Sequence, residues 1–230
     1  MAMINPFKEF TFLMKSEPKT DKKKPSRGWI IDESKCFTKI EVEKLRKQTF
    51  EEKTSGIRKM KFTQVRNWFM VELGLNVGLR VTEMAELKHS NVLVENNKSS
   101  IVLIGKGNKK RTVTISSSFK KTFKEYCQLK YKFGYDIDRE SNVLVNVKGT
   151  KISKRALQKF FKRIILKSGL PNYFSIHCLR HTYATFLLWA SGYNYRFVQK
   201  QLGHSSIRTT QIYASVVDSE GKKAVERLYK

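Results

Sequence analysis

Two short runs rich in β-branched residues, separated by a glycine-containing turn, most strongly constrain the fold of this chain. The runs are residues 101–104 (IVLI) and 112–115 (TVTI), and residues 105–108 (GKGN) lie between them. Such a pattern is typical of an antiparallel hairpin. Most other apolar residues recur at helical spacing. The chain is therefore predicted to be mainly α with a small antiparallel β-sheet, in the α+β class.

Capping residues and glycines divide the helical part of the sequence into segments. Thr38 and Glu41 have capping-box spacing and predict a helix that ends near residue 50, followed by a polar loop over residues 51–60. Apolar residues at helical spacing then continue until Gly78 stops them. The predicted helices cover residues 38–50, 62–78, 82–87, 116–133, 153–169 and 175–192, a short segment closing at 203, residues 207–214, and a last segment from 219.

The balance of charge indicates the kind of partner. The chain has 46 Lys and Arg against 20 Asp and Glu, a net charge of +26, and 40% of its residues are hydrophobic. It can therefore build a core, and its basic excess favours an acidic polymer, of which nucleic acid is the commonest. Anionic membrane is the other candidate. The longest uncharged run, residues 182–195, is too short to span a bilayer, so no membrane partner is expected.

The cysteines indicate the redox compartment. Cys36, Cys127 and Cys178 are an odd and widely spaced set. This argues against a disulfide framework and against a zinc ribbon. No secretory signal is evident near the N-terminus. We therefore expect a protein of the reducing cytoplasm.

The segment SIHCLRHTYAT, residues 175–185, is the most informative in the chain. His177 and Arg180 lie on one face, in the first turn after a predicted helix start. A helix N-terminus and a guanidinium both favour an oxyanion, so this turn is suited to a phosphate. Simple capping and solvation of the helix by these two side chains is the alternative. His177, Cys178 and His181 also have a spacing that suits a metal, but no carboxylate accompanies them; no metal is predicted, and Cys178 is expected in the core.

Three further segments carry chemically active side chains. Arg80 follows a helix-ending glycine in GLRVTEMAEL, and Lys106 lies at the hairpin tip in GKGNKKR. LGHSSIRTTQIYA places His204 at a loop-to-helix junction and Tyr213 nine residues later. A single tyrosine at a helix end is commonly a core residue. In their order, and together with the segment above, these motifs resemble the catalytic core of the tyrosine recombinase, or phage integrase, family over about residues 37–229.

The resemblance implies how the phosphate is held. Arg80 and Arg180 occupy the places of the two arginines that clamp the scissile phosphate. Two fixed guanidiniums neutralise the charge that develops on the non-bridging oxygens in the transition state. Glu83, three residues after the first arginine, occupies the place of an acidic residue that orients its neighbours. No cofactor is expected.

The resemblance also implies how protons move. Tyr213 is the nucleophile, and because a free tyrosine with a pKa of about 10 is protonated at neutral pH, its attack needs a base or a strong positive field. His177 is expected to be that base. Lys106 is expected to protonate the leaving 5′ oxygen as general acid, and His204 to donate a hydrogen bond to the phosphate. The expected activity is site-specific DNA recombination through a 3′-phosphotyrosine intermediate.

The predicted organisation departs from most of the family in one respect. Residues 1–35 hold three of the four prolines and are predicted to be a basic arm or linker. Residues 36–230 are predicted to be the catalytic domain, with a C-terminal helix at about residues 219–229. The helical core-binding domain that usually precedes the catalytic domain is expected to be absent. The side chains expected to follow the backbone of double-stranded DNA are Lys22, Lys23, Lys24, Lys109, Lys110 and Arg111.

Alternatives remain open at the level of function and assembly. A type IB topoisomerase-like enzyme would use similar chemistry to relax supercoils, and a non-catalytic DNA-binding regulator would keep the fold. Family resemblance implies a dimer or tetramer on DNA, linked through the C-terminal helix. Packing of that helix on its own core is the alternative. The DNA target, and the choice among integration, excision, inversion and resolution, cannot be deduced from the sequence.

Overall fold

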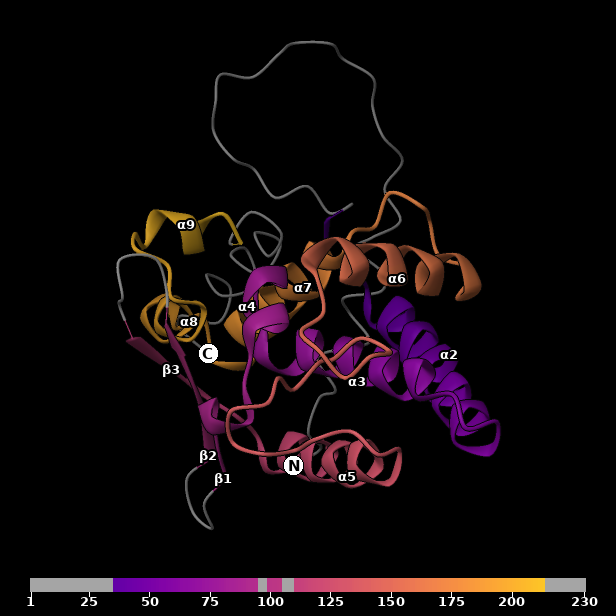
Figure 1. The fold of residues 1–230 in the computed structure, drawn as a ribbon. Helices are drawn as coiled ribbons and strands as arrows, with labels where there is room; N and C mark the ends of the chain where they lie inside the picture. The colour runs from indigo at the N-terminus through magenta and orange to yellow at the C-terminus, as the bar shows by residue number, and fades with distance from the viewer. Residues whose placement is uncertain (1–34, 95–98, 105–109, 214–230) are drawn as a thin grey trace, which may run out of the picture.

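The computed structural model describes residues 35–94, 99–104 and 110–213. Residues 1–34 of the predicted N-terminal arm, including Lys22, Lys23 and Lys24, lie outside the described residues, as do Lys106, Lys109 and the predicted C-terminal helix at residues 219–229. The described elements are α2 (Lys39–Arg58), α3 (Phe62–Val77), α4 (Val81–Glu86), the 3-10 helix η2 (His89–Asn91), β1 (Val92–Val94), β2 (Ser99–Ile104), β3 (Lys110–Thr114), α5 (Ser117–Lys132), α6 (Lys154–Lys167), α7 (Ile176–Ala190), α8 (Tyr195–Leu202) and α9 (Arg208–Gln211) (Figure 1).

The helix α3 is the centre of the core. It packs against α2, α5 and α7 (Figure 1), and most of its side chains are buried, as expected for a helix that is apolar nearly all round. Phe69 stacks on Tyr126 of α5 with ring centroids 4.0 Å apart. A Cβ at Gly74 would collide with Leu179 of α7, so glycine allows α3 and α7 to approach closely. This approach sets the position of α7, which carries much of the candidate site.

The predicted hairpin is confirmed, and it belongs to a slightly larger sheet. The strands β2 and β3 pair antiparallel with Ile101 opposite Val113, and β1 adds a third antiparallel strand in the order β1-β2-β3. The helix α8 packs against β3 (Figure 1). The backbone N–H of Thr114 donates to the Gln201 side chain across this contact at 3.0 Å. The mainly helical fold with a small antiparallel sheet is therefore as expected.

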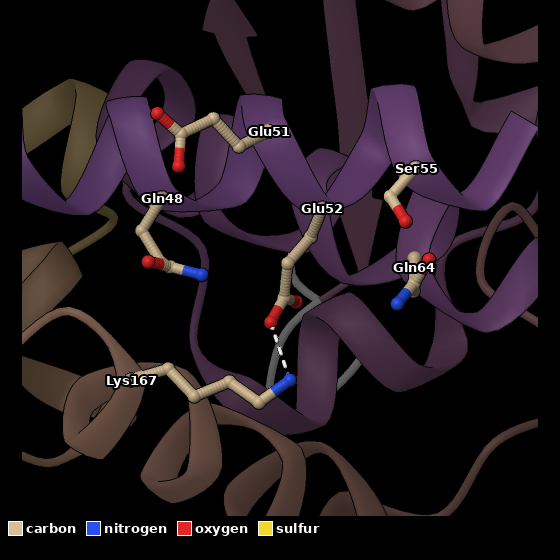
Figure 2. A pocket seen from close by; sticks show the side chains of 6 residues that line it. All are labelled: Gln48, Glu51, Glu52, Ser55, Gln64 and Lys167. Atoms are coloured by element: carbon tan, nitrogen blue, oxygen red, sulfur yellow. Dashed lines mark hydrogen bonds and ion pairs between the residues drawn. The ribbon is translucent and has the colours of Figure 1, made fainter.

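The predicted loop over residues 51–60 is wrong, because α2 continues to Arg58. Two of its charged side chains are buried and pair with exposed partners: Lys53 contacts Glu125 of α5 at 2.7 Å, and Glu52 contacts Lys167 of α6 at 2.6 Å. Figure 2 shows the second pair in a polar pocket. Tertiary ion pairs thus keep a polar sequence helical. The other residues that line the pocket are Gln48, Glu51, Ser55 and Gln64.

The helix lengths bear on the membrane alternative. Among the described residues, none of the helices combines the length and the apolar character that crossing a bilayer requires.

Candidate active site

Arg180 connects the segments that form the site. Its side chain is 7% exposed, and its two terminal nitrogens donate to the backbone carbonyls of Gly78, at 2.6 Å, and Leu202, at 2.8 Å. These carbonyls lie at the C-terminal ends of α3 and α8, where the helix leaves carbonyl groups unpaired. Burial, followed by the charge of Arg80, lowers the pKa of Arg180 to about 10. At neutral pH the buried group therefore keeps its charge.

Gly78 gives the chain the sharp turn that places Arg80. It caps α3 with a φ of 66°, and a Cβ there would collide with the ring of Tyr183. The predicted stop of α3 is confirmed. The next helix, α4, begins two residues earlier than expected, with Arg80 rather than Thr82 at the N-cap.

Glu83 is the anion around which the arginines gather. Its carboxylate accepts from the backbone N–H of Arg80 at 2.7 Å, from the Arg80 side chain at 2.8 Å, and from both terminal nitrogens of Arg111 at 2.6 and 2.9 Å. Arg180 lies 3.9 Å away. Burial alone would raise the pKa of Glu83, but the hydrogen bonds and charges of the arginines lower it to about 2. Three guanidiniums against one carboxylate leave two positive charges in excess.

Replacing Glu83 by glutamine should destabilise the protein in a pH-dependent way. A carboxyl pKa of about 2 in the fold, against an ordinary 4.5, corresponds to roughly 3 kcal/mol of stability at pH 7. Because the pKa is lowered by folding, this stability is present above pH 4.5 and is lost as the pH falls towards 2. Urea unfolding should therefore show that the deficit of Glu83→Gln in free energy of unfolding, relative to wild type, falls at pH 3 to roughly half or less of its value at pH 7.

The matched control is Glu86→Gln on the same helix. Glu86 is 67% exposed and pairs with an exposed Lys151 at 3.3 Å, so its substitution should change stability by less than about 0.5 kcal/mol. A Glu83→Gln deficit that does not vary with pH would show that the carboxylate charge is not what stabilises this cluster.

The structure gives Arg111 an intramolecular partner where the sequence predicted the DNA backbone. Its side chain is 13% exposed and binds Glu83 bidentately. It also lies over Gly203, which caps α8 with a φ of 66° and whose Cβ, if present, would collide with the Arg111 side chain. Arg111 therefore ties β3 to α4 and to the end of α8, one residue before His204.

Tyr213 and His204 lie face to face beside this cluster. Their ring planes are 4° apart, with centroids separated by 6.3 Å. The Nδ1 atom of His204 is 3.0 Å from the Thr210 hydroxyl. If Nδ1 accepts from Thr210, the neutral ring carries its proton on Nε2 and can donate from there. Burial, then the charge of Arg180, lowers the pKa of His204 to about 3, so the ring is neutral at pH 7.

The Tyr213 side chain is buried rather than solvated. It is 2% exposed and packs in a small cluster that includes Cys36, Leu188 and Leu202. Burial raises the pKa of Tyr213 to about 12, and the nearby charge of Arg180 opposes that rise. Its hydroxyl lies 3.1 Å from Nδ1 of His181.

The sequence pattern missed His181 as a member of this site. Its spacing from His177 suggested only a metal pair, and among the described residues no group of three or more metal-binding side chains is present. His177 is exposed on the first turn of α7. Cys178 is 4% exposed, which confirms that it packs in the core. The described residues thus bring together Arg80, Glu83, Arg111, Arg180, His181, His204 and Tyr213.

Comparisons with known proteins find a matching family and several relatives. Residues 35–220 match the model of the phage integrase family. The tyrosine recombinase XerC of Caldanaerobacter subterraneus subsp. tengcongensis is 31% identical over 163 residues, which are 70% of this chain and 44% of that protein. The chain spans about half the length of the curated relatives it matches.

Two solved structures share the fold. A complex of the XerH site-specific recombinase with a palindromic difH substrate, after cleavage, superposes with a TM-score of 0.68 at 25% identity, covering 85% of this chain and 53% of that chain. The XerA recombinase has a TM-score of 0.66 at 23% identity, covering 89% of this chain and 66% of that chain. The second likeness concerns the fold alone.

Proposed function

This chain belongs to the phage integrase family, and we propose that it is a site-specific DNA recombinase that acts through a 3′-phosphotyrosine intermediate. The observation that supports this proposal is that a buried tyrosine hydroxyl lies close to a cluster of cationic side chains. Tyr213 lies beside His204, and both lie within the electrostatic reach of Arg80 and Arg180. A nucleophile next to fixed positive charge is what attack on a phosphodiester needs.

The arginines would bind and activate the phosphate. Arg180 uses two of its five N–H groups on backbone carbonyls, which fixes the plane of the guanidinium and leaves the other N–H groups for oxyanions. Arg80 is 42% exposed and can turn one edge to solvent while Glu83 holds its position. Their charges would neutralise the non-bridging oxygens as negative charge grows on them.

The covalent step would exchange one phosphoester for another. The Tyr213 oxygen would bond to phosphorus while its proton passes to His177, the bond from phosphorus to the 5′ oxygen would break, and Lys106 would supply the proton for that oxygen. Lys106 lies outside the described residues, on the segment that joins β2 to β3. The Nε2–H of His204 would donate to the phosphate. Because the phosphotyrosine keeps the energy of the ester, a 5′ hydroxyl from another strand can reverse the reaction.

Double-stranded DNA is the proposed partner, bound by two or four copies of the chain. Lys110 is exposed at the start of β3, where it would meet a phosphate near the hairpin. The other proposed backbone contacts are Lys109, Lys22, Lys23 and Lys24, and the helix at residues 219–229 would link neighbouring subunits. Such contacts give affinity that depends on salt but reads little sequence.

Covalent capture on genomic fragments tests this function. The protein is incubated with DNA fragments from both sides of its gene, denatured, and assayed for DNA that remains attached. We expect attachment to the 3′ end of a break at a defined sequence, followed by joining of two such sites. Relaxation of supercoils without joining would favour a topoisomerase, and a protein that binds these fragments but forms no adduct would be a regulator; either result contradicts the proposal.

A further inference from the structure

The helix α5 has one face in the core and the other at the surface. Phe119, Phe123 and Tyr126 are buried, and each of these rings packs against Phe69 of α3. This packing fixes the rotation of α5 about its own axis. Residues on the opposite side of the helix therefore point away from the core.

The outward face of α5 carries a row of lysines. Lys121, Lys124 and Lys132 are exposed, and so is Gln128 in the middle of the row. With 3.6 residues per turn, these four positions fall within about a quarter of the helix circumference, and at 1.5 Å per residue the row is about 17 Å long. A DNA duplex of that length carries about ten phosphates. The row therefore matches the DNA backbone in sign of charge and in length.

The charge of this row is not balanced by acidic side chains of the same helix. Within residues 117–132 the one acidic residue is Glu125, and its carboxylate lies 2.7 Å from Nζ of Lys53, whose side chain is only 6% exposed. A buried lysine thus already neutralises that carboxylate. The exposed side of α2 differs, because it mixes the two signs of charge, as at Glu43 and Lys44. The outward face of α5 is therefore a surface of one sign.

The start of α5 has an arrangement of charge that does not favour folding. Ser116 caps the helix, and the first turn holds no acidic residue. Lys120 and Lys121 follow directly, and helical side chains lean towards the N-terminus. Positive side chains are repelled by the positive end of the helix dipole. A bound anion would be attracted by both the dipole and the lysines.

The row lies on the far side of α3 from the candidate active site. The helix α3 contacts α5 through Phe69 and α7 through Gly74, and Figure 1 shows α5 below α3, with α4 and α7 above it. Because packed helices have axes 8–10 Å apart, the outward face of α5 is about two helix layers from α7. A straight duplex bound at Arg180 therefore does not reach this row.

On the premise that double-stranded DNA is the partner, as proposed above, we propose that the outward face of α5 binds a second DNA duplex through its phosphates. The sequence of that duplex does not matter, because lysines that contact phosphates do not read bases. Each copy of the chain then holds two duplexes on opposite faces. This raises the local concentration of one duplex near the other, which serves an enzyme that joins two DNA sites.

A pull-down of one duplex by another tests this second surface. The protein is mixed with a biotinylated duplex from the DNA flanking its gene and with a labelled duplex of unrelated sequence, and the label retained on streptavidin beads is measured. In the triple variant Lys121→Gln, Lys124→Gln, Lys132→Gln we expect retention at 50 mM salt to fall at least about tenfold. Gel-shift binding to the biotinylated duplex should stay within about twofold of wild type.

The matched control removes the same net charge from another exposed surface. Its substitutions are Lys44→Gln, Lys47→Gln and Lys59→Gln, at three exposed positions in and directly after α2, and it should retain the labelled duplex as wild type does. Equal losses in both triple variants would mean that net charge alone holds the second duplex. Full retention by the α5 variant would mean that contacts between protein copies bridge the two duplexes. Either result would overturn the proposal.

Lysine acetylation separates this proposal from the recombinase function, because it needs no cleavage. With one flanking duplex per protein copy, Lys121 and Lys124 should react with acetic anhydride as in the free protein, and the unrelated duplex should then protect them while Lys44 stays reactive. Mass spectrometry measures the modification. Protection by the first duplex alone, or none by the second, would overturn the second surface. Protection in a protein that forms no covalent adduct would leave the second surface in place and remove the recombinase function.

Discussion

Tyr213→Phe is expected to form no covalent adduct with a nicked suicide duplex, while its gel-shift binding stays within about twofold of wild type. Only the nucleophilic oxygen is removed, and the ring still fills its place in the cluster around Cys36 and Leu202. Loss of the hydrogen bond to His181 should cost about 1 kcal/mol of stability. Gel electrophoresis of the denatured reaction detects the adduct, and urea unfolding detects any loss of fold.

The matched control for this substitution is Tyr131→Phe. Tyr131 lies on α5 and is 70% exposed, so its hydroxyl should not matter for the adduct or for binding. Adduct that persists in Tyr213→Phe would mean that another residue attacks the DNA.

Arg180→Ala is expected to reduce the rate of adduct formation by at least about 10²-fold and to destabilise the fold. The side chain would vanish from a buried position, and the carbonyls of Gly78 and Leu202 would each lose a charged donor. We expect the free energy of unfolding to fall by about 2–4 kcal/mol. Single-turnover cleavage and urea unfolding measure the two effects.

Arg180→Lys separates charge from geometry at this position. Lysine keeps a positive charge but cannot donate to both carbonyls and a phosphate in one plane, so its cleavage rate should stay far below wild type even where its stability largely recovers. The control is Arg46→Ala, which removes an arginine that is 45% exposed and paired with Glu72 on the surface. Wild-type cleavage by Arg180→Lys would contradict the role given to the guanidinium fork.

Local sequence signals predicted the parts of the fold that depend on them. The hairpin between β2 and β3 and the end of α3 at Gly78 follow from turn and cap chemistry, which short stretches of sequence specify. The loop over residues 51–60 was wrong because Glu52 and Lys53 find ion-pair partners on α6 and α5. Those partners lie far along the chain, so no local pattern reveals them.

In the candidate site, too, some features could be predicted from the sequence, whereas others depend on contacts between distant parts of the chain. The resemblance of four motifs to one family located Arg80, Arg180, His204 and Tyr213. They gave Arg111 a phosphate as partner, whereas its bidentate contact with Glu83 depends on how β3 lies against α4. The contact of His181 with Tyr213 likewise joins residues 32 positions apart. Pairings of this kind depend on the packing of whole elements.

The most direct test of the central claim is to identify the amino acid that carries the DNA. The wild-type adduct is digested with nuclease and trypsin, and the peptide that retains nucleotide is sequenced by mass spectrometry. We predict a nucleotide joined through its 3′ phosphate to the phenolic oxygen of Tyr213, in the peptide of residues 209–222. Attachment to any of the other eight tyrosines among the chain's nine, or through a 5′ phosphate, would contradict it.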